Sequence, residues 1–225
     1  MSKDAERVLC VPREVLELAC GGELFQGYQH ATVAEGQDVL ATVLHDDVVR
    51  FMRRGDCEDD PSLKQIIPYV ALLQRFNWED GNGRILRYNR AAKGEGESRL
   101  SGLATVGIGG HINRQDYRGD LQNTFLRAYK REITEEVRIE SPFEAEVTGF
   151  INDDSDAVGQ VHFGVLIVLR LQLPCVYPNE SNIVQPHFVP LDHLCRDACE
   201  EHDEFETWSR IVLTSHAFGH RRTKR

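Results

Sequence analysis

The chain has 225 residues, of which 41% are hydrophobic and 28% charged, so it can bury a sizeable core. Its formal net charge of −10 argues against a protein that binds nucleic acid through clustered Lys and Arg, and only the C-terminal HRRTKR is basic. No apolar run approaches the roughly 18 residues of a membrane span. The start MSKDAERVL lacks signal-peptide features and the six cysteines are scattered, so we expect a reduced, cytoplasmic protein.

Residues 1–62 carry mostly local signals. Apolar residues recur at helical spacing over 13–19, and again in pieces over 36–55, where Gly55 ends the pattern. We therefore expect an N-terminal extension over 1–62 that packs on a main domain over 63–225.

The main domain begins with strands. The run IIPYVALLQRF (66–76) is short and apolar, WEDGNG (78–83) is a strong hairpin signal, and RILRYNRA (84–91) is expected as the partner strand. After a polar, glycine-rich loop at 93–98, a further strand over 103–112 runs into two adjacent glycines.

The second half of the chain alternates between helices and strands. We expect a helix over 123–138, an antiparallel strand pair over 145–153 and 159–173, a loop over 178–186 and one or two helices over 188–218. Because hairpins dominate over regular strand–helix–strand units, the pattern predicts an α/β fold of the α+β type, with helices packed on a mixed sheet.

The helix expected at 123–138 separates its side chains by chemistry. Its apolar stripe, which should face the sheet, contains Leu126, Tyr129, Ile133 and Val137. A second stripe, which should face water, contains Arg127, Lys130, Thr134 and Arg138. A third stripe, beside the apolar one, contains Glu132, Glu135 and Glu136.

Two interpretations of the three glutamates are open. Charged surface helices are common, and Arg131 can pair with Glu135 at i,i+4. However, Glu132 and Glu136 stack at i,i+4, which costs roughly 0.2–0.5 kcal/mol for like charges. A hard divalent cation such as Mg²⁺, which prefers oxygen ligands, would remove that cost.

Two adjacent glycines, Gly109 and Gly110, precede this helix at the end of a predicted strand. Adjacent glycines allow unusual backbone angles and the close approach of another group. A tight turn explains them as well as a ligand site does, but a backbone carbonyl there is a candidate oxygen for a cation held by the helix.

These features together resemble the Nudix box, whose pattern is G-x5-E-x7-R-E-U-x-E-E-x-G-U, with U an aliphatic residue. The second half of the pattern matches at Arg131, Glu132, Ile133, Glu135, Glu136 and Ile139. The strings GIGGHI, GFINDD and VHFG are similar to those of a bacterial subgroup of MutT-like proteins described as predicted phosphoesterases. The resemblance covers about residues 66–215 and implies a Nudix-like α/β/α sandwich.

The chain departs from the family pattern in three places. Arg138 stands where the pattern has its last glycine, and Asn123 stands where it has its first glutamate. The segment 111–122 also lengthens the connection between the glycines and the helix. Asn123 is a good helix N-cap, which favours a structural use of that position.

The resemblance implies a diphosphohydrolase that uses Mg²⁺ or Mn²⁺. Nudix hydrolases cleave a diphosphate bond in a nucleoside diphosphate linked to another moiety, by attack of water on phosphorus. By position, Glu132 and Glu136 would be the principal metal ligands, and Glu135 a further ligand or an aid in activating water. Arg131 would orient a glutamate, and the Gly109 carbonyl would complete the metal shell. Because a diphosphate is anionic, a carboxylate cluster can bind it only through metal.

Four further residues are candidates for contact with the substrate. His111 follows the glycines and His162 lies in a predicted strand, and each is equally compatible with a structural role. Arg87 lies on the strand predicted at 84–91. Glu180 lies in the PNESN loop, where related enzymes often place a late acid.

Two other clusters have a structural explanation. Asp153, Asp154 and Asp156 could include a general base, but turn residues that bond their own backbone are the stronger interpretation. Cys195 and Cys199 stand at i,i+4 in a single cluster, whereas structural zinc sites use two, so we expect buried free cysteines.

The sequence therefore predicts a metal-dependent Nudix hydrolase acting on a nucleotide or another organic pyrophosphate. Its partners would be this small molecule and, at most, a second copy in a homodimer, with neither membrane nor nucleic acid. The alternative is a Nudix-fold nucleotide-binding or regulatory module that does not hydrolyse. An isomerase of the isopentenyl diphosphate type would need a catalytic Cys and acid in a prenyl pocket, for which the sequence shows no placement.

Overall fold

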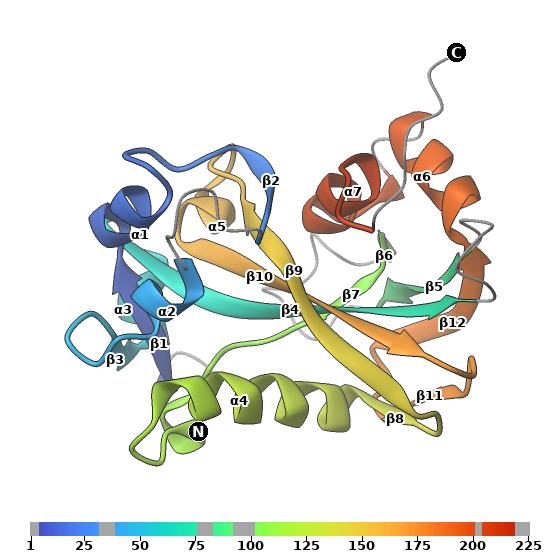
Figure 1. Ribbon diagram of the computed structural model, residues 1–225, viewed down its shortest axis with the longest axis horizontal. Helices are drawn as coiled ribbons and strands as arrows, with labels where there is room; N and C mark the ends of the chain where they lie inside the picture. The colour runs from blue at the N-terminus through green and yellow to red at the C-terminus, as the bar shows by residue number, and fades with distance from the viewer. Residues whose placement is uncertain (1–4, 32–38, 76–82, 92–101, 201–203, 219–225) are drawn as a thin grey trace. The chain divides into compact units, whose positions relative to one another are not determined.

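The computed structural model describes residues 5–31, 39–75, 83–91, 102–200 and 204–218 (Figure 1). The chain divides into two compact units. The first contains Met1–Tyr69, Gly109–Glu132 and Val147–Leu166, and the second contains Val70–Ile108, Ile133–Glu146 and Ile167–Arg225. The domain boundary expected at residue 62 stays a prediction.

The N-terminal residues contribute strands to the first unit. β1 (Arg7–Pro12) pairs antiparallel with β3 (Arg50–Arg53) and with the start of β4 (Leu63–Arg75). β2 (Gly27–His30) pairs antiparallel with the end of β9 (Phe143–Asn152). The remaining elements of this unit are α1 (Arg13–Ala19), α2 (Val39–Val43), α3 (Arg54–Glu58), a 3-10 turn η3 (Arg114–Asp116), most of α4 (Leu121–Glu136), α5 (Ala157–Gln160) and the start of β10 (His162–Leu171).

The helix predicted at 13–19 is confirmed by α1, but the helical pieces predicted over 36–55 are only partly right. Among the described residues of 36–55, only α2 and the start of α3 are helical, and residues 50–53 form β3. The register of β3 with β1, which pairs Phe51 with Leu9, shows the reason. Pairing with a distant strand overrides the local periodicity of a short segment.

The second unit is built around a strand pair that the sequence predicted in part. β5 (Gly83–Arg90) pairs antiparallel with the end of β4 and, on its other side, with β12 (Ile183–Pro190). This unit also contains the end of α4, the start of β9 and the end of β10, together with β6 (Ala104–Thr105), most of β7 (Gly107–Gly109), β8 (Val137–Ile139), β11 (Val176–Pro178), α6 (Leu191–Glu200) and α7 (Thr207–Thr214). The hairpin turn expected at 78–82 and the loop expected at 93–98 lie outside the described residues.

The loop predicted over 178–186 is wrong in its last part, which is a strand. β12 begins at Ile183 and is interrupted by a register shift between Val184 and His187. Pro186 and Pro190 hide this strand from sequence analysis, because proline within a run favours an edge strand or no strand at all. The register shift is a β-bulge, and it accommodates Pro186 within the strand.

Helix α4 is a single helix that ends two residues earlier than predicted (Figure 1). Val137 and Arg138 belong to β8, which pairs with β11. Asp120, not Asn123, caps the start, because its side chain accepts the Asn123 N–H at 3.3 Å and its carbonyl accepts the Thr124 N–H at 3.0 Å.

The predicted apolar stripe of α4 is right except at its first member. Tyr129, Ile133 and Val137 are buried, whereas Leu126 is 43% exposed and Phe125 takes its place in the core. Phe125 precedes Tyr129 by four residues, so it shares the buried face with Tyr129 and Ile133. No described helix is long and apolar enough to cross a membrane.

An aromatic cluster tests the packing of the first unit. Phe163 is fully buried, and its ring centroid lies 6.0 Å from that of Phe25 and 5.8 Å from that of Phe150. We expect Phe163→Ala to lower the free energy of unfolding by about 3–5 kcal/mol, through lost burial and the cavity left behind. Urea denaturation measures this change. Phe143→Ala, at a ring that is 46% exposed, is the control and should stay within about 1 kcal/mol of the parent; equal losses would contradict the placement of Phe163.

Candidate functional site

Gly110 lies where the carboxylate of Glu132 approaches the backbone. Its N–H donates to the Pro68 carbonyl at 3.4 Å. A Cβ atom at Gly110 would collide with the carboxylate group of Glu132. Neither Gly109 nor Gly110 has a positive φ, so close approach and not an unusual backbone angle explains this glycine.

Arg131 holds the carboxylate of Glu132 in place. Its Nη1 donates to Glu132 Oε1 at 2.7 Å, and its Nη2 donates to the His111 carbonyl at 2.9 Å. The same guanidinium makes two bonds to Asp116, from Nε to Oδ1 at 3.0 Å and from Nη2 to Oδ2 at 2.9 Å. Burial on its own would lower the pKa of Arg131, but the bonds to Asp116 and Glu132 outweigh it and raise the pKa.

Asp116 is the residue of this cluster that sequence analysis missed. It is only 5% exposed and comes from the segment 111–122, which lengthens the family pattern. Its side chain also accepts the Asn113 N–H at 2.9 Å, closing the short turn η3. The signal was present as Asn113-x-x-Asp116, a spacing typical of a helix start. The inserted segment therefore supplies an acidic partner for the arginine of the box.

Two predicted substrate residues, His111 and His162, lie together. His162 Nδ1 is 2.7 Å from the Val158 carbonyl, which can only accept, so Nδ1 carries the proton. In the neutral ring, His162 Nε2 is then an acceptor, and it lies 3.4 Å from His111 Nε2, which donates. Burial lowers the pKa of His162, in agreement with a neutral ring.

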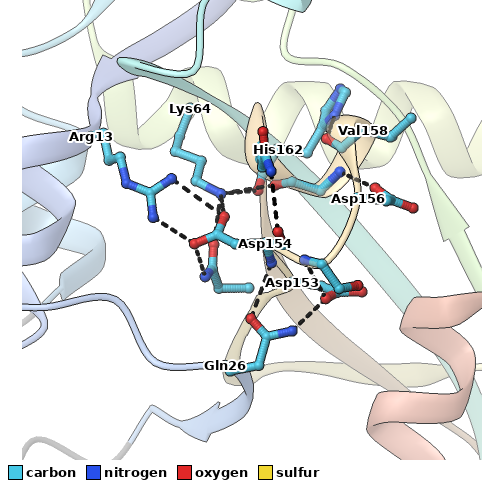
Figure 2. A network of polar contacts seen from close by, with 12 residues as sticks. Arg13, Gln26, Lys64, Asp153, Asp154, Asp156, Val158 and His162 are labelled. Carbon is cyan, nitrogen blue, oxygen red and sulfur yellow. Dashed lines mark hydrogen bonds and ion pairs between the residues drawn. The ribbon is translucent and has the colours of Figure 1, made fainter.

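A fully buried lysine organises the loop before His162 (Figure 2). Lys64, on β4, is 0% exposed. Its ammonium group donates to oxygens of Asn152 at 2.8 Å, Asp154 at 2.6 Å, Gly159 at 2.8 Å and His162 at 3.3 Å. The bonds to the Gly159 and His162 carbonyls set the path of the backbone from which the His162 ring projects.

Residues of the N-terminal segment complete this network (Figure 2). Arg13 Nη2 lies 2.5 Å from Asp154 Oδ2, and the Asp154 N–H donates to Gln26 Oε1 at 3.0 Å. Gln26 Nε2 donates to Asp153. Arg13 and Gln26 of the N-terminal segment therefore hold the loop that contains Asp153 and Asp154.

Hydrogen bonds to nearby backbone confirm the turn interpretation for Asp153 and Asp156, whereas the Asp154 side chain binds Arg13 and Lys64 instead. Asp153 accepts the Ser155 N–H at 3.1 Å, and Asp156 caps α5 by accepting the Gly159 N–H at 2.7 Å. Burial would raise the pKa of Asp154, but hydrogen bonds from Arg13 and Lys64 outweigh it and hold the pKa below its usual value. A carboxylate bound by two cations is a weak proton acceptor, which disfavours Asp154 as a general base.

In the second unit, Glu136 is held by the segment between β11 and β12. Asn182 Nδ2 donates to Glu136 Oε2 at 3.1 Å. Asn179 binds the end of α4, with its N–H on the Glu136 carbonyl at 2.9 Å and its Nδ2 on the Thr134 carbonyl at 2.8 Å. Glu135 lies in the same last turn, where it is exposed.

Three other predicted positions have these surroundings. Arg138 lies in β8, with its guanidinium 4.8 Å from the Tyr177 ring centre and an ion pair to Glu140, so it forms a surface contact. Arg87 is half-buried on β5, and alternation along the strand places it on the face opposite Tyr88. Glu180 is half-buried, and its carbonyl accepts the Ile183 N–H at 3.4 Å.

The donors present fit a hard cation in chemistry but are not gathered into a metal cluster. Among the described residues, no three His, Cys, Asp or Glu side chains are close enough to hold an ion. Beside Glu136, Asn182 is only 7% exposed, and its Oδ1 has no hydrogen-bond partner in the part of the chain that the structure describes. Cys195 is half-buried and Cys199 exposed, so burial was wrongly expected for Cys199.

The chain is similar in sequence to one curated protein and in structure to solved Nudix proteins. The chain matches no model of a known protein family. It is 34% identical over 218 residues to protein YmaB of Bacillus subtilis (strain 168), covering 95% of this chain and 98% of that protein. The crystal structure of Tm1382, provisionally classed as a Nudix hydrolase, aligns with a TM-score of 0.69 and 27% identity, over 93% of this chain and 97% of that one.

A second structure aligns over a smaller part of the chain. The NUDIX domain of Shewanella oneidensis NrtR, solved with ADP ribose, aligns with a TM-score of 0.42 and 17% identity, over 59% of this chain and 77% of that one. The likeness to Tm1382 confirms the expected fold class, an α/β fold of the α+β type with the mixed sheet and sandwich architecture of Nudix proteins.

The Arg131–Asp116 pair gives a direct test of the inserted segment. In a double-mutant cycle of Asp116→Ala and Arg131→Ala, we expect a coupling of about 1.5–3 kcal/mol, because two charge-assisted hydrogen bonds join buried or half-buried groups. The free energy of unfolding in urea measures it. Arg127→Ala with Asp116→Ala is the control cycle, since the hydrogen bond from Arg127 to Asp116 goes to the main-chain carbonyl, which Asp116→Ala keeps. Additive losses in the first cycle would contradict the pair.

The Lys64–Asp154 pair gives a second test. We expect Asp154→Asn to cost about 3–5 kcal/mol of stability near neutral pH, because it leaves a buried ammonium without its carboxylate. The double variant Lys64→Met/Asp154→Asn should recover part of this loss. A depressed carboxylate pKa gives stability that is present above the unfolded pKa of about 3.9 and lost as pH falls through the folded value. Denaturation as a function of pH should therefore show the difference shrinking below about pH 4, and a loss that does not depend on pH would argue against the ion pair.

Proposed function

Because this chain belongs to the Nudix family, in a group that it shares with Bacillus subtilis YmaB, we propose that it is a metal-dependent hydrolase of a diphosphate bond. The observation that carries this proposal is the arrangement of the acids on α4. Glu132 and Glu136 lie one helical turn apart, and each carboxylate is oriented by a hydrogen-bond donor, Arg131 or Asn182. A surface helix has no need of such oriented acids.

The proposed roles follow from these contacts. Glu132 and Glu136 would hold Mg²⁺ or Mn²⁺, with Glu135 as a further ligand or an aid in activating water. The Gly109 carbonyl would add one oxygen, and Arg131 would keep Glu132 in position. When bound, the cation would neutralise negative charge on the phosphates and lower the pKa of the attacking water.

The substrate class proposed is a nucleoside diphosphate linked to another group, or a related organic pyrophosphate. Water attacks one phosphorus, the bond from that phosphorus to the bridging oxygen breaks, and two phosphate products leave. Of the predicted substrate residues, His111 and His162 have the best support, because their Nε2 atoms lie 3.4 Å apart and the His111 carbonyl accepts a hydrogen bond from Arg131. The substrate roles of Arg87 and Glu180 stay predictions.

A second candidate is a Nudix-fold module that binds a nucleotide without hydrolysis. Arg138, in place of the last glycine of the box, favours it. The segment 111–122 does not favour the binding module, because its Asp116 binds the arginine of the box. The two candidates differ in a single measurable property, the release of phosphate or nucleotide products.

We expect Glu136→Gln to lose nearly all hydrolysis while unfolding like the parent, because it removes a charged ligand. The measurement is product release with Mg²⁺ over nucleotide sugars, dinucleotide polyphosphates and nucleoside triphosphates. Glu144→Gln, at an exposed position on β9, is the matched control and should keep full activity. A wild-type chain inert on the whole panel, with no Mg²⁺ binding by calorimetry, would favour the binding module.

A further inference from the structure

We propose that the side-chain oxygen of Asn182 is an additional ligand for the cation held by Glu136. This inference rests on the proposed function and extends its ligand set beyond the positions of the Nudix box. Asn182 lies 46 residues beyond Glu136, in the segment between β11 and β12.

The carboxylate of Glu136 dictates how the Asn182 amide is oriented. An ionised carboxylate can only accept hydrogen bonds, so the amide group that faces it must be the nitrogen. Nδ2 lies 3.1 Å from Oε2 and 3.5 Å from Oε1, so it faces the carboxylate group as a whole. The amide oxygen, bonded to the same carbon as Nδ2, is therefore turned away from Glu136 but stays near it.

This oxygen is buried without a protein donor. Asn182 is 7% exposed, and its Oδ1 has no hydrogen-bond partner among the described residues. A buried polar atom without a partner costs on the order of 1–3 kcal/mol. An amide oxygen next to a carboxylate adds to the negative potential there, and a bound cation would be stabilised by both groups.

The surroundings hold Asn182 firmly enough for a ligand. Its carbonyl accepts the Ala91 N–H at 3.0 Å, which ties it to the end of β5. The neighbouring Ile183 pairs with Arg90 in the register of β12 with β5. Asn179 attaches the same segment to the end of α4 at the Glu136 and Thr134 carbonyls. The amide therefore has a fixed position relative to Glu136.

Carboxylate and amide oxygens are both ordinary ligands for hard divalent cations. A neutral amide oxygen adds a ligand here without adding another repelling charge.

Two simpler roles for Asn182 make different predictions. If Asn182 only orients Glu136, any substitution that removes its N–H donor should weaken cation binding. If it only stabilises the segment between β11 and β12, loss of Asn179 should have the same effect. A ligand role requires the oxygen and not the donor.

The experiment is a Mn²⁺ titration followed by electron paramagnetic resonance of the free ion, on the full chain without substrate. Asn182→Leu and Asn182→Ala remove the oxygen, and we expect each to weaken Mn²⁺ binding by about tenfold to a hundredfold. Asn182→Asp keeps an oxygen but loses the donor, and we expect Mn²⁺ affinity equal to or above that of the wild type. Asn179→Ala, which removes one hydrogen bond to α4, should change the affinity less than about threefold.

The outcomes separate this inference from the proposed function. If Asn182→Asp and Asn182→Leu weaken Mn²⁺ binding equally, the ligand role is overturned in favour of orientation. Wild-type Mn²⁺ affinity in all Asn182 variants would overturn the ligand role outright. A wild-type chain that binds no Mn²⁺ would overturn it as well. The thermal shift caused by Mn²⁺, taken against each variant's own metal-free midpoint, gives the same ranking for a variant that is less stable. If the panel of pyrophosphates is not hydrolysed but the ranking holds, the ligand role stands and the hydrolase proposal fails.

Discussion

Repulsion among the carboxylates of α4 is the constraint on which the rest of this site depends. Acids one turn apart destabilise a helix, and they keep a useful orientation only if a donor holds each of them. Glu132 is held by Arg131, and Glu136 is held by Asn182. Both donors are themselves fixed, Arg131 by Asp116 and Asn182 by its carbonyl bond to Ala91. Glu132 is therefore supported from its own helix and Glu136 from another segment, and each supporting residue is fixed by a contact outside the helix.

The buried ammonium of Lys64 imposes a comparable constraint on the first unit. A buried charge is tolerated only when oxygens surround it, and the loop from 152 to 162 supplies them. That requirement sets the backbone at His162 and, through Asp154, gives Arg13 of the N-terminal segment its partner. The N-terminal residues thus take part in the structure near the predicted histidines, in addition to forming strands β1 to β3.

Sequence analysis succeeded where the signal was local and long. The periodicity of α4, the apolar run of β4 and the partner strand β5 each extend over at least eight residues, and each was predicted at nearly the right bounds. It failed for β3 and β12, which are short or contain prolines and depend on a partner far away in sequence. The helix start was also misplaced, because the cap at Asp120 decides it and periodicity does not.

By itself, the sequence determined the order and spacing of Arg131, Glu132, Glu135 and Glu136 and the helix that carries them, because a period of 3.6 residues depends only on the local backbone. It also determined the resemblance to the Nudix box. Only the tertiary structure decided that Arg131 binds Asp116, that Glu132 lies against Gly110, and that Asn182 faces Glu136. These contacts join residues 15 to 46 positions apart, and no local pattern encodes which distant donor a carboxylate will meet.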